Sequence, residues 1–227
     1  MDDRSKCLPA PYKRRRYYIP KDVKVHTTGH DCWVSFFGGV YDLSTLIYEH
    51  IEDPLIEPII AAAGTDITHW FDPETKDPKM CVYEPTGLEG VYCPQGRFLH
   101  VPSINPDANF DSSFEIPWWK DKEKYLIGNL TTKTRKIKIM NMLSKQEDII
   151  KVACEETMNE ILDRYLPLNS HAASYTWKRL RQPLDMDLNL EENGIEDETD
   201  EYKELNIEPD SYIPIIHLYY NDDLTVK

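Results

Sequence analysis

The sequence lacks any run of about 20 apolar residues, the length that a membrane-spanning helix needs. Its N-terminus is polar and basic, so the apolar stretch of a secretion signal is missing too. The five cysteines (Cys7, Cys32, Cys81, Cys93 and Cys154) form no CxxC pair, which excludes a zinc ribbon and a thioredoxin-type centre. These absences predict free thiols in a reducing compartment, with the cytosol as the default.

Basic residues are too few to balance the acidic ones. The chain has 26 Lys and Arg against 40 Asp and Glu, which gives a net charge of −14. Nucleic acids and anionic membranes repel such a chain, so neither is an expected partner. Residues 13–16 form one basic run, which is either a patch for targeting or partner binding or, more often, part of a solvated arm. We predict that residues 1–16 are a disordered basic arm.

Catalytic motifs are also missing. The sequence has no G-x-G-x-x-G, P-loop, G-x-S-x-G or H-E-x-x-H pattern. Asp185, Asp187 and Asn189 alternate like calcium ligands, but the glycine and the glutamate of an EF-hand loop are not at the required positions. We therefore predict that the protein is not an enzyme.

The length of 227 residues and the hydrophobic content of 41% are typical of two small globular domains. In the first half, residues 32–37 alternate and are rich in aromatics, which predicts a strand. The Gly38-Gly39 pair predicts a turn, residues 40–43 a returning strand, and a short helix then ends at His50.

Three segments of this half resemble the cytochrome b5 family: residues 41–50, 64–71 and 125–130. In that family the histidine at the place of His50 ligates haem iron. The resemblance implies a b5-like domain over residues 17–130, with an insertion at about 72–124 before its last strand. It also implies haem b as the cofactor.

The haem motif departs from the family pattern in two places. Residues 51–53 replace the Pro-Gly-Gly that follows His50 in the family, whose glycines let the backbone turn beside the haem. Lys76 stands where the second ligand is expected. Cys81 and His69 are the remaining candidates for a second iron ligand, and a Cys81 thiolate would give a site of low potential. We predict weak haem binding, with His50 as the main ligand.

The insertion at about 72–124 holds prolines, aromatics and polar residues in no repeating pattern. A segment with no periodic face to bury is ordered most readily by a partner. Trp118 and Trp119 are therefore candidate anchors for partner binding. The alternative is that both pack back onto the b5-like core.

Residues 131–227 predict a second domain with one helix. Thr157 opens the helix with a T-x-x-E capping box, and its apolar face would face a sheet. That face consists of Met158, Ile161, Leu162 and Tyr165. The predicted strands are residues 136–139, 150–154, 175–177, 185–190 and 213–220, with an acidic loop at 191–204. This order resembles the ubiquitin-like β-grasp and implies a docking domain.

The predicted fold class is α+β, a b5-like domain followed by a ubiquitin-like β-grasp. Together the halves resemble a family of ciliary axoneme proteins associated with radial spokes. Residues 67–73, 169–177, 190–195 and 220–225 carry this resemblance. It implies a structural or adaptor subunit in the cytoplasm and cytoskeleton, at the axoneme of the cilium, with other axonemal or radial spoke proteins as partners. The alternative is a haem-binding redox protein or redox sensor in cilia.

Overall fold

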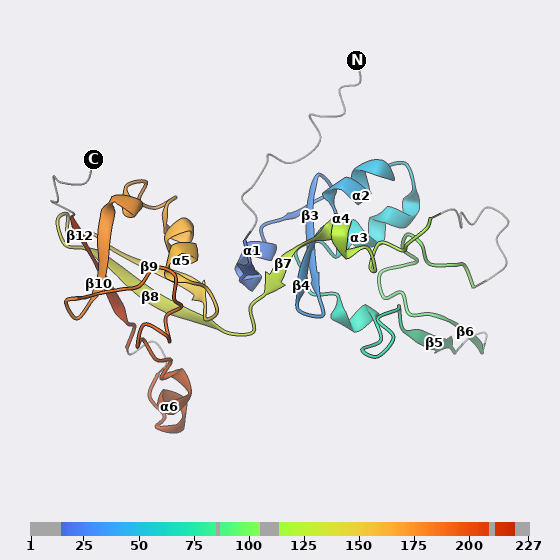
Figure 1. Cartoon of the computed structure of the whole chain (residues 1–227). Coiled ribbons are helices and arrows are strands. Elements are labelled where there is room, and N and C mark those ends of the chain that lie inside the picture. The colour runs from blue at the N-terminus through green and yellow to red at the C-terminus, as the bar shows by residue number, and fades with distance from the viewer. Residues whose placement is uncertain (1–14, 85–86, 105–113, 209–211, 221–227) are drawn as a thin grey trace, which may run out of the picture. The chain divides into compact units, whose positions relative to one another are not determined.

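The computed structural model describes residues 15–84, 87–104, 114–208 and 212–220. The chain divides into two compact units, Met1–Leu130 (unit 1) and Thr131–Lys227 (unit 2), each with its own sheet and core (Figure 1). Of the predicted basic arm, residues 1–14 lie outside the described residues. Among the helices described, none combines the length and apolarity needed to cross a membrane.

Unit 1 is built on a five-stranded sheet with the order β1-β7-β4-β3-β2. Its strands are β1 (Tyr17–Tyr18), β2 (Thr27–Thr28), β3 (Asp31–Phe36), β4 (Gly39–Asp42) and β7 (Leu126–Leu130). Its helices are α1 (Pro20–Val23), α2 (Ser44–Glu49), η2 (Pro54–Ile56), α3 (Glu57–Ala61), η3 (Thr68–Trp70) and α4 (Lys122–Tyr125). A separate hairpin joins β5 (Met80–Tyr83) to β6 (Leu88–Val91).

The two predicted strands of unit 1 are confirmed by β3 and β4, but the turn between them is Phe37-Gly38 and not Gly38-Gly39, because Gly39 already pairs with Phe36. Both residues of the tight turn, Phe37 (φ 47°) and Gly38 (φ 73°), have positive φ, as two-residue hairpins with the twist of the sheet require. After β4, the Asp42 carboxylate accepts hydrogen bonds from the backbone N–H and the hydroxyl of Ser44, at 3.0 and 2.6 Å. These bonds begin α2, so they also determine where His50 lies at its end.

The insertion is not a loop outside the domain, as the lack of a pattern suggested. Its residues Phe98, Leu99, Val101, Trp118 and Trp119 join the hydrophobic core of unit 1. The core also takes residues from β3, α2 and α3. The large aromatics among these described residues bury their apolar surface within unit 1 itself.

Unit 2 is a second five-stranded sheet, with the order β11-β10-β12-β8-β9. Its strands are β8 (Thr134–Asn141), β9 (Glu147–Ala153), β10 (Tyr175–Arg179), β11 (Gln182–Pro183) and β12 (Ile215–Tyr220). Its helices are α5 (Met158–Tyr165), η4 (Ala172–Ser174) and α6 (Thr199–Glu204). The central pair, β8 and β12, is parallel, and the other pairs are antiparallel.

The predicted helix of unit 2 is confirmed. Thr157 and Glu160 form the reciprocal capping box at the start of α5. Met158, Ile161 and Tyr165 are fully buried in the core of the unit. Leu162, the fourth residue of the predicted face, is partly buried against the same core.

The strand predicted for residues 185–190 is wrong. Asp185 accepts a hydrogen bond from the backbone of Asp187 at 3.0 Å, and Asn189 accepts one from Glu192 at 2.9 Å. Short polar side chains that bond to nearby backbone in this way compete with a sheet ladder. The acidic stretch at 191–204 also differs from the prediction, since it ends in α6.

Candidate functional site

His50 is the last residue of the turn that closes α2. Its backbone N–H donates to the carbonyl oxygens of Leu46 and Ile47, at 3.2 and 3.3 Å. The chain then turns without the family's Pro-Gly-Gly. The carbonyl of His50 accepts from the Asp53 N–H at 2.9 Å, and the Asp53 side chain caps η2 by accepting from Leu55 at 2.9 Å. An aspartate cap therefore makes the bend for which the family uses glycines.

The insertion brings a second histidine to His50. The rings of His50 and His100 have centres 6.2 Å apart and planes at 88°. His100 has a left-handed backbone, with φ 69°, which is uncommon for any residue other than glycine. Backbone strain of this kind is often retained at functional sites.

His100 was not among the predicted ligands. The sequence offered one indication of it: His100 stands between apolar residues, in Phe98-Leu99-His100-Val101. This run lies in the insertion, for which we predicted no regular structure. All three apolar neighbours are buried in the core of unit 1, which holds His100 in place from both sides.

The His50 and His100 pair fits the donor set of a haem site. Two imidazoles that bind one metal ion from opposite sides, each at about 2 Å, have ring centres about 6 Å apart. Haem iron needs only two protein ligands when both are histidines. Within the ranges that the structure describes, no group of three or more His, Cys, Asp and Glu side chains gathers as a metal site would require.

One hydrogen bond opposes ligation by His100. The backbone N–H of Trp118 donates to Nδ1 of His100 at 3.1 Å, so the neutral ring carries its proton on Nε2. The ring of Phe114 also stacks on that of His100, with centres 4.1 Å apart. His100 can bind iron through Nε2 only by giving up this proton and the bond from Trp118. The separation of the two rings thus suits one shared metal ion, while the Trp118 bond and the Phe114 ring compete with iron for His100.

The other predicted ligands lie elsewhere. His69 is exposed in η3, with its ring edge-on to that of Trp70. Cys81 is half-buried in β5, where it and Cys93 add to the effect of burial in raising the pKa of Tyr83. The described ring contact of His50 is with His100 and not with His69.

Lys76, at the expected position of the second ligand, has a structural role. Its ammonium lies over the ring of Phe37, 3.9 Å from the ring centre, which is a cation–π contact. The contact holds the loop after η3 against the turn between β3 and β4.

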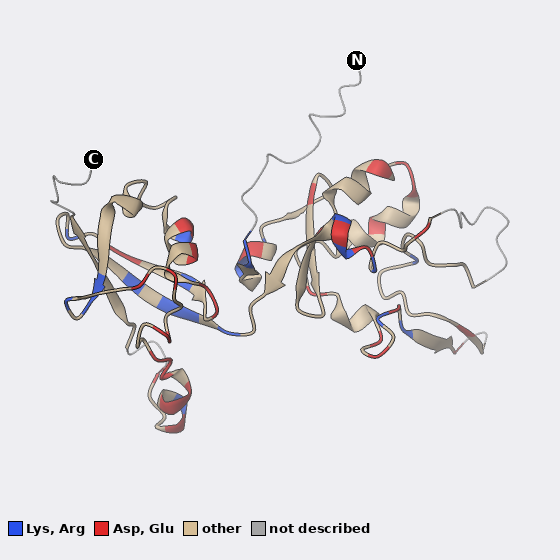
Figure 2. Ribbon diagram, viewed as in Figure 1, with Lys and Arg blue, Asp and Glu red and all other residues tan. Residues whose placement is uncertain are grey.

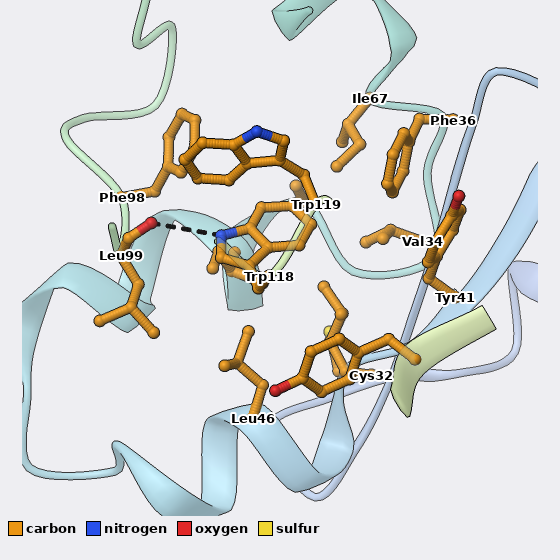
Figure 3. Close-up of a cluster of buried hydrophobic side chains, with 14 of the residues drawn as sticks. Cys32, Val34, Phe36, Tyr41, Leu46, Ile67, Phe98, Leu99, Trp118 and Trp119 are labelled. Carbon is orange, nitrogen blue, oxygen red and sulfur yellow. Dashed lines mark hydrogen bonds between the residues drawn. The ribbon is translucent and has the colours of Figure 1, made fainter. Parts of the chain in front are cut away.

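Trp118 and Trp119 are not surface anchors, so their predicted role in partner binding is wrong. Their exposed fractions are 0% and 7%, and both rings lie within the aromatic core (Figure 3). The indole N–H of Trp118 donates to the Leu99 carbonyl at 3.2 Å, and that of Trp119 to Asp77 at 3.2 Å. Because each polar N–H has a partner, burial costs little and the apolar rings can fill the core.

Comparisons with known proteins cover both units. A family model described as "Cytochrome b5-like Heme/Steroid binding domain" matches residues 20–131. "Cytochrome b5 domain-containing protein 1" of Xenopus laevis is 52% identical over 212 residues, which are 93% of this chain and 97% of that protein. The protein of the same name from Homo sapiens is 46% identical over 214 residues, 94% of this chain and 93% of that protein.

The chain belongs to the cytochrome b5 domain-containing protein 1 family. A "Cytochrome b5" of Candida tropicalis is 44% identical over only 55 residues, 24% of this chain. The similarity to the cytochrome b5 domain-containing proteins therefore extends well beyond the b5-like part. The b5-like domain makes haem b a cofactor open to this chain, and His50 with His100 would hold it.

Proposed function

We propose that the protein is a non-enzymatic structural or adaptor subunit of the ciliary axoneme, at the radial spoke, and that it supports ciliary beating. The two units support an adaptor role, because each has its own hydrophobic core and can present a separate binding surface. Similarity to its relatives over 93% of the chain supports a role that needs both units.

Unit 2 supplies the observation that carries this proposal. Helix α5 covers one face of its sheet with Met158, Ile161 and Tyr165, and on the other face Lys136 and Lys138 alternate with the buried residues of β8. A hairpin, a helix and a parallel pair between the first and last long strands are features of the ubiquitin-like β-grasp, the fold that we propose for this unit. Folds of this kind often act as docking modules, and this analogy supports the adaptor role.

The localisation test uses the endogenous protein with a small tag. We expect it in isolated axonemes after detergent extraction, and we expect it to leave the axoneme together with radial spoke proteins at high salt. Its presence only in the detergent-soluble fraction would refute the proposed role.

A second candidate function is that of a haem-binding redox protein or redox sensor. The observation that favours it is the His50 and His100 pair, with ring centres 6.2 Å apart. Bound haem would supply one-electron chemistry, and His50 and His100 would hold its iron. In the chain, α2 holds His50 at its end, while the Trp118 N–H keeps His100 in the tautomer that opposes iron.

Haem titration of the full-length protein tests this candidate. We expect weak, substoichiometric binding, since iron must displace the Trp118 bond to His100. His50→Ala should abolish the Soret band, and His100→Ala should convert any six-coordinate spectrum to a five-coordinate one. His69→Ala is the matched control and should leave the spectrum unchanged. Tight stoichiometric binding would contradict the competition at His100, and loss of the band in the control alone would refute the ligand assignment.

A further inference from the structure

The face of the unit 2 sheet opposite α5 carries the side chains that alternate, along each strand, with the buried core residues. We call it the basic face. Its residues are Lys136, Lys138, Met140, Ile149, Lys151, Thr176, Lys178, Ile215, His217 and Tyr219. The register places them side by side: Lys138 pairs with both Ile149 and Ile215, and His217 pairs with Lys178. In a pleated sheet, directly opposite residues point to the same side.

The charge of this face is opposite to that of the chain as a whole. Four lysines and one histidine lie on it, in a chain of net charge −14. One acidic residue, Glu147, lies on the same face opposite Met140 and forms an ion pair with Lys138 at 3.0 Å. Figure 2 shows basic segments on β8, β9 and β10, and acidic ones gathered on α6 and the loops.

Apolar groups lie among these charges. Ile149 of the edge strand β9 is 55% exposed, and its partner Lys138 also pairs with Ile215 on the other side. The Lys178 ammonium lies 5.1 Å from the ring centre of Tyr219, and the His217 ring lies 6.4 Å from it. Lysines with interleaved aliphatic and aromatic groups match a partner that is both acidic and apolar, since each kind of group needs its own complement.

A cavity of about 180 Å³ at one end of the sheet limits where such a partner can bind. It is lined by four basic residues, Arg135, Lys136, Lys151 and Arg179, and by the acidic residues 196–198. Because charges of both signs lie close together there, the cavity offers an acidic partner no surface of one sign. On the rest of the face, around Lys138, Lys178 and His217, an acidic partner would compete only with Glu147 for Lys138.

We propose that the basic face binds an acidic segment of another protein in which aliphatic or aromatic side chains alternate with Asp or Glu. A protein segment fits better than a nucleic acid, because Ile149, Ile215 and Tyr219 offer contacts to aliphatic and aromatic side chains, which a phosphate backbone lacks. This inference rests on the proposed adaptor role and adds the chemistry of the partner. The two proposals can be refuted independently. Binding to the basic face is measured on purified protein, whereas the adaptor role is tested by the location of the protein in the axoneme.

The test titrates the full-length, isotope-labelled protein with a short peptide of alternating glutamate and leucine, and follows amide chemical shifts. We expect shifts in β8, β9, β10 and β12, and not in unit 1. The double variant Lys138→Gln with Lys178→Gln should weaken binding about three- to tenfold, since exposed ion pairs each contribute little. The control, Lys122→Gln with Lys145→Gln, makes the same change in net charge at two exposed lysines that are not members of the face, one in unit 1 and one in the turn between β8 and β9, and should bind as the unaltered protein does.

Several outcomes would overturn the proposal. The first is an equal loss of affinity for the peptide in both double variants. The second is equal affinity for a peptide that has glutamine in place of glutamate. The third is a set of amide shifts confined to the cavity end of the sheet or to unit 1. Tighter binding of a single-stranded oligonucleotide to the same strands would assign the face to nucleic acid. Concentration-dependent dimerisation that is lost in the Lys138 and Lys178 variant would assign it to a second copy of the chain. Unchanged amide shifts elsewhere in unit 2 will show that each variant is folded.

Discussion

Replacing Trp118 tests whether the insertion is an integral part of the core of unit 1. Its side chain is fully buried, and its ring centre lies 6.0 Å from that of Phe36 and 6.0 Å from that of Phe71. Its indole N–H satisfies the Leu99 carbonyl at 3.2 Å. The Trp118→Ala change therefore removes a large apolar group and a hydrogen-bond donor together.

Two effects determine how much stability unit 1 loses. A buried tryptophan replaced by alanine costs about 3–5 kcal/mol, through lost transfer free energy and the cavity left behind. The Trp118→Phe variant keeps most of the apolar volume but leaves the Leu99 carbonyl without its donor, which costs about 1–3 kcal/mol. We expect alanine to destabilise unit 1 more than phenylalanine does.

Hydrogen exchange on the intact chain measures this loss for each unit separately. Protection in β3 and β4 should fall in both variants, whereas protection in β8 and β9 of unit 2 should not change and serves as the internal control. If Trp118→Ala leaves the protection of β3 and β4 unaltered, the insertion is not part of this core. Equal losses in both units would indicate a general effect of the variant and would also refute the reasoning.

Two further predictions concern unit 2. Ile161→Ala should lower the free energy of unfolding of unit 2 by about 2–5 kcal/mol, as the loss of other buried aliphatic side chains does. Urea unfolding measures this change. A change within experimental error would mean that α5 does not pack on the sheet. Burial alone would raise the pKa of Asp197, but hydrogen bonds from Thr199 and Lys133 lower it to about 2. Since the folded pKa is below the usual 3.8, this stabilisation is present above about pH 4 and is lost as the pH falls towards 2. Unfolding midpoints measured across this range should therefore depend less on pH in Asp197→Asn, and equal pH dependence would contradict the pKa assignment.

The elements that the sequence predicted well depend on close neighbours in the chain. The capping box of α5 needs only Thr157 and Glu160, three residues apart. The turn before β4 needs only the adjacent Phe37 and Gly38, and the prediction placed it one residue late, at Gly38-Gly39. The burial of Met158, Ile161 and Tyr165 follows from helical spacing alone. Such local patterns can be predicted from the sequence because they do not depend on contacts with distant parts of the chain.

The candidate site depends on distant parts of the chain, and this is why its second histidine was missed. His50 and His100 come together only because the insertion folds onto the core between β6 and α4. The family spacing points to Lys76, which lies in a loop closed by its contact with Phe37. The tryptophans were misread for the same reason: their acceptors, the Leu99 carbonyl and Asp77, lie far from them in sequence.

In both sheets, strands from the two ends of the unit pair with each other, and this has a consequence for synthesis of the protein. In unit 1, β1 pairs with β7, so Tyr17 meets Asn129, and in unit 2 the first strand, β8, pairs with the last, β12. Each sheet therefore stays incomplete until its final strand has left the ribosome, because long-range pairings cannot form earlier. A premature stop codon shortly before Ile215 would remove the central strand of unit 2, expose both neighbouring strand edges and make the truncated chain a target for quality control, while unit 1 would still fold.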